Sequence, residues 1–194
     1  MHREHEVLDL EVISREVNSM FSGLPYEVPE LLLLHGGYSP DAISELESAL
    51  GCHLPDDFKR TIETYRLSGF SLGPIDFSSG VDYLRSIYEN NRSSDEPRWW
   101  GSGDRPEELL LIAVSDRFPL LISTVNSDII TYDMDSARDR SLIRVASCFS
   151  MLMRGAGTMV VRRGDGDVSV SFTLNILKAT GGEPASEIFW RTIA

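Results

Sequence analysis

The chain has 194 residues, and 30 Asp and Glu against 18 Lys and Arg give it a formal net charge of −12. With 42% hydrophobic and 25% charged residues, it has the composition of an ordinary globular protein, and its length suits one domain with appendages better than two full domains. The acid excess argues against nucleic acid and against an anionic membrane surface as partners, because both are bound through Lys and Arg. It favours a basic protein partner, with acidity that serves solubility alone as the alternative.

Three features of the chain indicate a cytoplasmic protein. The longest apolar run, Leu109 to Val114, is far shorter than the ~20 residues of a membrane-spanning helix. The N-terminus mixes acidic and basic residues and lacks the apolar stretch of a signal peptide. Cys52 and Cys148 are too few for a disulfide framework, which fits a reducing compartment.

Residues 1–35 predict an N-terminal helical extension. Within 7–21, apolar residues recur at helical spacing, at Leu10, Ile13, Val17 and Met20. Ser22 to Pro25 then ends the pattern, because Gly and Pro interrupt helices.

Residues 40–50 carry the clearest helix signal. Ser39 is a suitable N-cap, Pro40 suits the first helical position, and Gly51 suits the end of the helix. The apolar stripe of this helix consists of Ile43, Leu46, Ala49 and Leu50. A second helix is expected to start near Pro55 and to end at Ser68-Gly69.

The middle of the chain predicts a set of short strands. Alternating or continuous apolar runs between turn residues mark them. The expected strands are residues 70–72, 75–77, 109–114, 120–125, 129–132 and 142–145. Residues 126–128 would form the loop of a hairpin, and helices are expected at 81–88 and 146–153.

Residues 158–194 predict a C-terminal β-hairpin followed by an apolar tail. The pattern changes after Gly155-Ala156-Gly157, and 159–162 is expected to pair with 168–176. In the second run apolar and polar residues alternate, as in a half-buried strand.

No set of residues points to catalysis, a metal or a cofactor. Cys52 and His53 are adjacent, so their side chains point in different directions, and Cys52 lies at a helix C-terminus, whose negative end raises the pKa of a thiol. A calcium loop starting at Asp133 would need Gly and Glu where the chain has Arg138 and Arg144. We therefore expect no catalytic residue, no metal and no cofactor.

The loop expected at 90–106 holds Trp99 and Trp100, a residue type enriched in the energetic centres of protein interfaces. Acidic residues next to them would form a rim. The alternative is that one tryptophan fills the core and the other covers it. The candidate partner-binding residues are Trp99, Trp100, Asp104, Glu107, Glu108 and Asp116.

Residues 37–59 combine an I-x-x-x-E-x-x-L-like helix with a G-x-x-L-P-x-D-[FY]-[KR] element and a second helix. The second element is matched by Gly51, Leu54, Pro55, Asp57, Phe58 and Lys59. This segment resembles the opening of the SUKH superfamily. Residues 111–116, 128–133 and 145–152 are similar to later segments of those domains, although Arg117-Phe118-Pro119 replaces their usual glycine-rich turn and Cys148 splits Ser147 from Phe149.

The resemblance covers about residues 36–154 and implies an α+β fold, with a mostly antiparallel sheet and helices packed on it. The SUKH-like core would be 36–157, with residues 1–35 as an added helix and 158–194 as an added β-hairpin and tail packed on the same domain. Bacterial members are mainly immunity proteins that bind a cognate toxin, often a nuclease or deaminase, and fungal relatives include a protein-interaction regulator of cell-wall assembly.

Three hypotheses follow for the function. The first is a non-catalytic immunity protein that neutralises a basic toxin domain by direct binding. The second is a regulatory protein-interaction module with no toxin partner. The third is a small hydrolase built around Cys52 and His53 or around a pair of carboxylates. The oligomeric state is left open.

Overall fold

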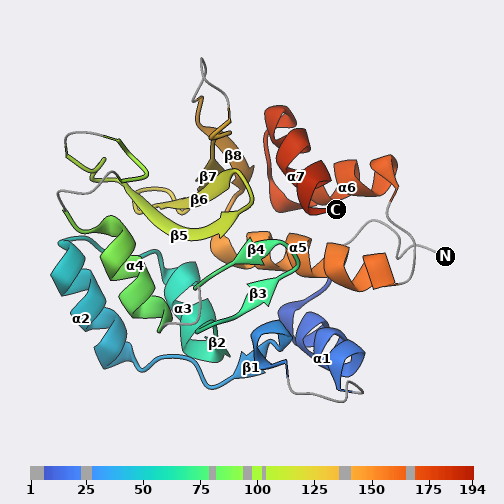
Figure 1. Cartoon of the computed structure of the whole chain (residues 1–194), viewed down its shortest axis with the longest axis horizontal. Coiled ribbons are helices and arrows are strands. Elements are labelled where there is room, and N and C mark those ends of the chain that lie inside the picture. Colours follow the sequence, from blue (N-terminus) through green and yellow to red (C-terminus); the bar gives the residue numbers. More distant parts are fainter. Residues whose placement is uncertain are drawn as a thin grey trace.

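The computed structural model describes residues 7–22, 28–78, 82–93, 98–101, 104–135, 141–164 and 169–194. In these ranges, helices pack on a six-stranded sheet of order β3-β4-β5-β6-β7-β8, in which every neighbouring pair is antiparallel (Figure 1). The α+β class, with a mostly antiparallel sheet and helices packed on it, is confirmed.

The strands of the sheet lie within two residues of the expected ones. They are β3 (Ser71–Leu72), β4 (Ile75–Asp76), β5 (Leu109–Ser115), β6 (Phe118–Ser123), β7 (Ile129–Thr131) and β8 (Ile143–Ala146). A separate two-stranded sheet pairs β1 (Leu34–His35) with β2 (Tyr65–Arg66). The helix predicted to continue to Ser68 therefore ends earlier, because Tyr65 and Arg66 turn into strand.

The rest of the described structure consists mainly of helices. They are α1 (Leu10–Phe21), α2 (Pro40–Leu50), α3 (Asp56–Thr64), α4 (Tyr83–Asn91), α5 (Phe149–Gly164), α6 (Val170–Thr180) and α7 (Glu187–Ile193), with short 3-10 helices η1 (Pro29–Leu31) and η2 (Pro184–Ser186). Helix α5 runs along the sheet, and α2, α3 and α4 gather beside it (Figure 1). Phe149 of α5 packs edge-on against Phe58 of α3 and Phe77, with ring centroids 4.7 and 6.0 Å apart.

The residues of segment 37–59 that match the family pattern, called the signature residues below, form the corner between α2 and α3. The side chain of Ser39 accepts the first cap hydrogen bond of α2, and Gly51 ends the helix at φ 66°, so both predicted caps are confirmed. Glu47 Oε1 accepts the backbone N–H of Leu54 at 2.7 Å and lies 3.4 Å from Lys59 Nζ. The acidic and basic positions of the signature therefore hold the turn in place.

Asp57, another signature residue, joins α3 to the beginning of α5. Its carboxylate accepts the backbone N–H of Ser150 at 2.8 Å and the Ser150 hydroxyl at 2.7 Å. Ser150 lies in the first turn of α5, where backbone N–H groups have no partner within the helix. Asp57 thus satisfies a helix end that lies 93 residues away in the chain.

Replacing Asp57 by alanine is expected to lower the free energy of unfolding by about 1–3 kcal/mol, because both Ser150 donors lose their acceptor. Asp56→Ala is the matched control, since Asp56 lies in the same helical turn with a 90% exposed side chain and is expected to cost less than about 1 kcal/mol. Urea denaturation measures both variants. Equal losses would contradict the assigned role of Asp57.

The expected C-terminal β-hairpin is wrong. Residues 159–162 belong to α5, and the described part of 168–176 belongs to α6 or to its N-cap Ser169. Gly155 and Gly157 do not end the helix but permit close packing on it. A Cβ at Gly155 would lie 2.6 Å from Cη2 of Trp190, and a Cβ at Gly157 would lie 2.5 Å from Cγ2 of Ile13. The two glycines therefore let α7 and α1 approach α5.

The C-terminal segment covers the outer edge of β8. The backbone N–H of Glu183 donates to the carbonyl of Arg144 at 2.9 Å, and the indole N–H of Trp190 donates to the carbonyl of Val145 at 3.2 Å. An uncovered edge strand is a template for pairing with another chain. Residues 180–190 therefore close this end of the sheet.

The N-terminal helix α1 confirms the expected helix, although it begins at Leu10 and not at residue 7, and the chain before it is hydrogen-bonded to α5. The N–H of Leu8 donates to Thr158 Oγ1 at 2.8 Å, and Arg154 donates to the carbonyl of Leu8 at 3.0 Å. We propose that the chain is divided into an N-terminal extension (1–35), a core segment (36–157) and a C-terminal extension (158–194). Position 157 lies inside α5, so the second and third segments share one helix.

Candidate partner-binding surface

Trp99 and Trp100 form an edge-to-face pair whose ring centroids are 5.3 Å apart. Both residues are of intermediate burial, so neither is fully enclosed in the core and neither is fully exposed. The indole N–H of Trp99 donates to Oδ1 of Asn91 at 3.1 Å, and the carbonyl of Trp99 accepts the hydroxyl of Tyr132 at 2.7 Å. The described residues 98–101, called the tryptophan loop below, are thereby held to both α4 and the end of β7.

Asn91 is the buried residue that fixes this loop to the sheet. It is 2% exposed, and its Nδ2 donates to the carbonyls of Ile87 and Leu111 at 2.8 and 2.9 Å while its Oδ1 accepts the N–H of Leu111 at 2.8 Å. On this side of β5, strand β4 pairs with Val114 and Ser115. The side-chain amide of Asn91 therefore takes the place of a neighbouring strand at Leu111. A fully hydrogen-bonded buried amide holds its surroundings rigidly.

Arg105 holds the chain between the tryptophan loop and β5. Its guanidinium donates to the carbonyl of Leu109 at 2.8 Å and to the carbonyls of Pro106 and Glu107 at 3.3 and 3.4 Å. It also reaches the carbonyl of Leu50 at 3.5 Å, at the C-terminal end of α2, where a cation is favourable. The backbone that carries the acidic candidates is thus anchored at several points.

The acidic candidates lie at the two ends of β5. Asp104, Glu107 and Glu108 precede the strand and are exposed, and Asp116 is exposed in the turn that follows it, at φ 48°. Seven residues of strand separate the ends by about 20 Å. Asp104, Glu107 and Glu108 therefore lie close to the tryptophans in sequence and precede β5, whereas Asp116 lies at the opposite end of that strand.

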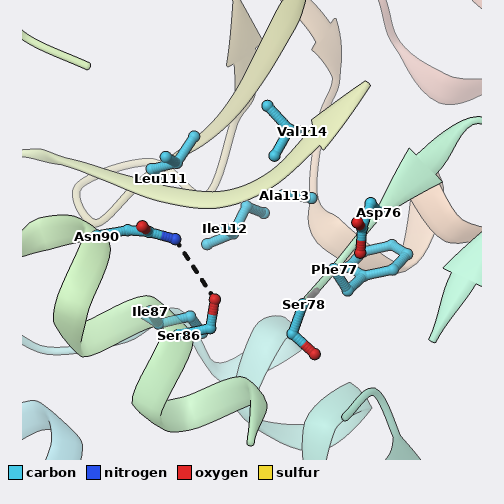
Figure 2. Close-up of a pocket in the computed structure, with 10 residues that line it drawn as sticks. All are labelled: Asp76, Phe77, Ser78, Ser86, Ile87, Asn90, Leu111, Ile112, Ala113 and Val114. Atoms are coloured by element: carbon cyan, nitrogen blue, oxygen red, sulfur yellow. Dashed lines mark hydrogen bonds between the residues drawn. The ribbon is translucent and has the colours of Figure 1, made fainter. Parts of the chain in front are cut away.

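The side of the sheet that faces away from α4 is apolar; Leu121 on it is fully buried, whereas Leu111, Val114 and Ile130 are at least partly exposed. Leu111, Leu121 and Ile130 stand directly opposite one another on β5, β6 and β7, so they share one face of the sheet. Figure 2 shows Leu111 and Val114 pointing to the same side of β5, whereas Ile112 points toward α4. Val114 is 39% exposed. This outer face, defined by Leu111, Val114, Leu121 and Ile130, extends from the tryptophan loop toward Asp116.

Sequence reasoning missed the residues that position this surface. Asn91 stands at the end of a helix and Arg105 in a Gly-, Ser- and Asp-rich stretch, where polar residues normally face solvent. Their hydrogen-bond partners are backbone groups of β5 and α2, which no side-chain motif marks. Residues 109–114 are all apolar, so the sequence does not show which of them face outward, and the register shift between Leu111 and Ala113 changes the alternation there.

The cysteine considered as a nucleophile has an unfavourable setting. Cys52 is half-buried, and burial raises the pKa of its thiol above the usual value, which disfavours the reactive thiolate. The side chain of His53 is 98% exposed, and its Nδ1 lies 3.9 Å from Glu47. The adjacent pair therefore gives no support to the hydrolase hypothesis.

Two further findings concern metals and membranes. In the ranges that the structure describes, no group of three or more His, Cys, Asp or Glu side chains is arranged to hold a metal ion. Among the helices of those same ranges, none combines the length and apolar character required to cross a bilayer.

Comparison with known proteins identifies the family. No curated protein matches the chain significantly. A family model, that of the SMI1 / KNR4 family (SUKH-1), matches residues 37–155, which is more than half of the chain. Its members are in general non-catalytic domains with a protein-interaction role of an immunity or regulatory type. From the matched segment and the α+β fold, the chain belongs to the SMI1 / KNR4 family (SUKH-1).

Proposed function

We propose that this protein is a cytoplasmic immunity protein that neutralises a cognate toxin by direct binding. The toxin domain would be basic and of the nuclease or deaminase type. Family membership and the net charge of −12 support an acidic protein-binding role. The observation that carries the proposal is the tryptophan loop, which is held by a buried asparagine and flanked by exposed carboxylates.

Binding would proceed in two stages with different physical causes. Asp104, Glu107 and Glu108 attract a basic partner over distances comparable to the Debye length, about 8 Å at physiological salt. Trp99 and Trp100 then supply the apolar contact, because large aromatic side chains carry much of the energy of protein interfaces. An interface of standard size would cover about 800 Å² of this protein. No step requires a catalytic residue or a cofactor.

The test is co-expression with the toxins encoded beside this gene, scored by survival of the host. The wild-type chain is expected to rescue the host from one of them. Trp100→Ala is expected to raise the dissociation constant of that complex at least about 30-fold, as substitutions at the energetic centre of an interface do. Val170→Ala is expected to leave the dissociation constant unchanged. Val170 is a suitable control because it is 57% exposed on α6, away from the tryptophan loop.

The salt dependence of association gives a second measurement on the same complex. The association rate constant is expected to fall steeply as ionic strength rises, and the double variant Glu107→Gln, Glu108→Gln is expected to flatten that dependence. Association that does not respond to salt would contradict the electrostatic part of the proposal. Failure to rescue from every adjacent toxin, together with co-purification of a housekeeping protein, would favour the regulatory interaction module instead.

A further inference from the structure

A pocket of about 250 Å³ lies beside the two-stranded sheet of β1 and β2. Its apolar walls are Pro29, Leu32 and Leu34, and two charged side chains, Glu30 and Arg66, also line it. None of these residues belongs to the tryptophan loop or to the outer face, and β1 and β2 lie on the opposite side of the molecule from β7 and β8 (Figure 1). The pocket is therefore separate from the candidate partner-binding surface.

The register of the small sheet places apolar side chains next to the guanidinium of this pocket. Leu34 and Arg66 are direct partners in the antiparallel pair, so their Cβ atoms lie about 5 Å apart on one face. Leu32 has extended backbone and lies two residues before Leu34, so it shares that face. Leu33 and Tyr65, which have the opposite alternation, are buried. One face of the sheet thus carries two leucines and a cation toward the pocket.

The walls of the pocket are held by hydrogen bonds. The hydroxyl of Ser68, on the turn after β2, lies 2.6 Å from the hydroxyl of Tyr38 and accepts the N–H of Tyr83 at 3.3 Å. On the opposite wall, the N–H of Leu32 donates to the carbonyl of Pro29 at 3.2 Å. The pocket is therefore bounded by a closed 3-10 turn and an anchored loop.

The guanidinium of Arg66 is available to a ligand. Arg66 is exposed, and within the ranges that the structure describes it takes part in no hydrogen bond or ion pair, whereas Arg92 and Arg154 each pair with a carboxylate. Glu30 lines the same pocket but forms no ion pair with Arg66 among those residues. The donor groups of Arg66 thus lie next to an apolar wall without an acceptor of their own.

The size and the charges of the pocket select the class of ligand. The planar guanidinium of Arg66 matches the geometry of a carboxylate, and Leu32 and Leu34 offer contact area to an aliphatic chain. Pockets for drug-sized ligands measure about 300 Å³ or more, so the occupant is smaller than such a ligand. The negative charge of Glu30 disfavours a second negative charge on the ligand, as in a phosphate dianion or a dicarboxylate.

We propose that this pocket binds a small monocarboxylate with a branched aliphatic tail. The carboxylate accepts hydrogen bonds from Arg66, and the tail rests on Leu34 and Leu32. Because Arg66 and Leu34 are direct neighbours across the sheet, a short chain reaches both, and no second polar contact is required. This binding activity goes beyond the proposed function, since it involves neither the tryptophan loop nor a protein partner.

The probe is 4-methylpentanoate, titrated at fixed pH into the isotope-labelled full-length chain and followed by two-dimensional NMR. Saturable shifts are expected at the backbone amides of Leu32, Leu34, Arg66 and Gly69, with a dissociation constant in the millimolar range, as suits one exposed ion pair and a small apolar contact. Shifts confined to other residues, or no saturable shift, would overturn the proposal.

Two analogues separate the contributions of charge and tail. The uncharged 4-methylpentanamide has the same shape and is expected to bind at least about fivefold more weakly, because it lacks the charged hydrogen bonds to Arg66. Acetate keeps the charge but lacks the tail, and it is also expected to bind more weakly. If either analogue bound as tightly as 4-methylpentanoate, the assigned ligand class would be wrong.

Three variants make the result specific to this pocket. Arg66→Gln is expected to weaken binding of 4-methylpentanoate at least about fivefold. Glu30→Gln removes a repulsive charge and is expected to tighten binding about twofold, a gain that unfolding cannot imitate. Arg60→Gln removes the same charge from an exposed position on α3 that does not line the pocket, and it is expected to change nothing. Equal effects of Arg66→Gln and Arg60→Gln would show a response to net charge alone and would contradict the site.

Discussion

Replacing Gly37 by alanine is expected to prevent the chain from reaching its native fold. Gly37 lies where the chain between β1 and α2 passes against the end of α3, with the N–H of Tyr38 donating to the carbonyl of Ile62 at 2.9 Å. A Cβ at Gly37 would overlap that same carbonyl oxygen and lie 2.8 Å from the carbonyl carbon of Glu63. Both obstacles are backbone atoms, which cannot rotate away. We expect a loss of more than about 4 kcal/mol in the free energy of unfolding.

The neighbouring glycine is the matched control for this substitution. Gly36 has φ 93°, but a Cβ there would meet no atom within 4 Å. Gly36→Ala is therefore expected to cost about 1–2 kcal/mol, the strain of a left-handed conformation alone. Soluble yield and urea denaturation measure both variants. If Gly37→Ala were as stable as Gly36→Ala, the close approach to α3 would not be a constraint on the fold.

Replacing Trp190 by alanine is expected to lower the free energy of unfolding by about 3–5 kcal/mol. Trp190 is fully buried, its ring lies against Gly155 of α5 and 5.2 Å from the ring of Phe189, and its indole N–H bonds the carbonyl of Val145. The substitution leaves a cavity between α5 and α7 and removes a hydrogen bond from the edge of β8. Both the cavity and the lost hydrogen bond lower the free energy of unfolding.

Ile188→Ala is the control for Trp190→Ala, because Ile188 is on the same helix but 47% exposed. It is expected to change the free energy of unfolding by less than about 1 kcal/mol. Calorimetry or urea denaturation measures the difference. A loss below about 1 kcal/mol in Trp190→Ala would show that the C-terminal helices are not needed to close the sheet.

The segments outside the family match are integral parts of this fold. Helix α1 approaches α5 at Gly157, and α7 approaches it at Gly155, so both added segments pack on the same helix. The matched segment, 37–155, ends inside that helix. Its two end residues, Gly37 and Gly155, are both positions where a side chain would collide with a neighbouring element. Both ends of the matched segment therefore lie at positions where elements of the fold pack closely.

The strand predicted at 168–176 is wrong because the residues that α6 buries are not the ones that its apolar pattern marks. Apolar and polar residues alternate in 168–176, which predicts a strand. The buried positions of the helix are Thr173, Ile176, Leu177 and Thr180, which recur at helical spacing. Two of them are threonines, and the apolar Val170 faces solvent. Thr180 is buried because its hydroxyl donates to backbone carbonyls, including Val145 of β8. A hydropathy pattern cannot reveal burial of that kind.

The sequence by itself determined the elements whose causes lie within a few residues of each other. The caps Ser39 and Gly51, the strand at 109–114 and the hairpin between β6 and β7 were predictable, because capping, turn chemistry and apolar runs act locally. The loop of that hairpin is longer than expected, because β6 ends at Ser123 and not at residue 125. Only the tertiary structure decided which glycines are packing positions and which polar side chains replace a strand. Asn91 and Gly155 depend on backbone and ring atoms far along the chain, and that proximity exists only after the chain has folded.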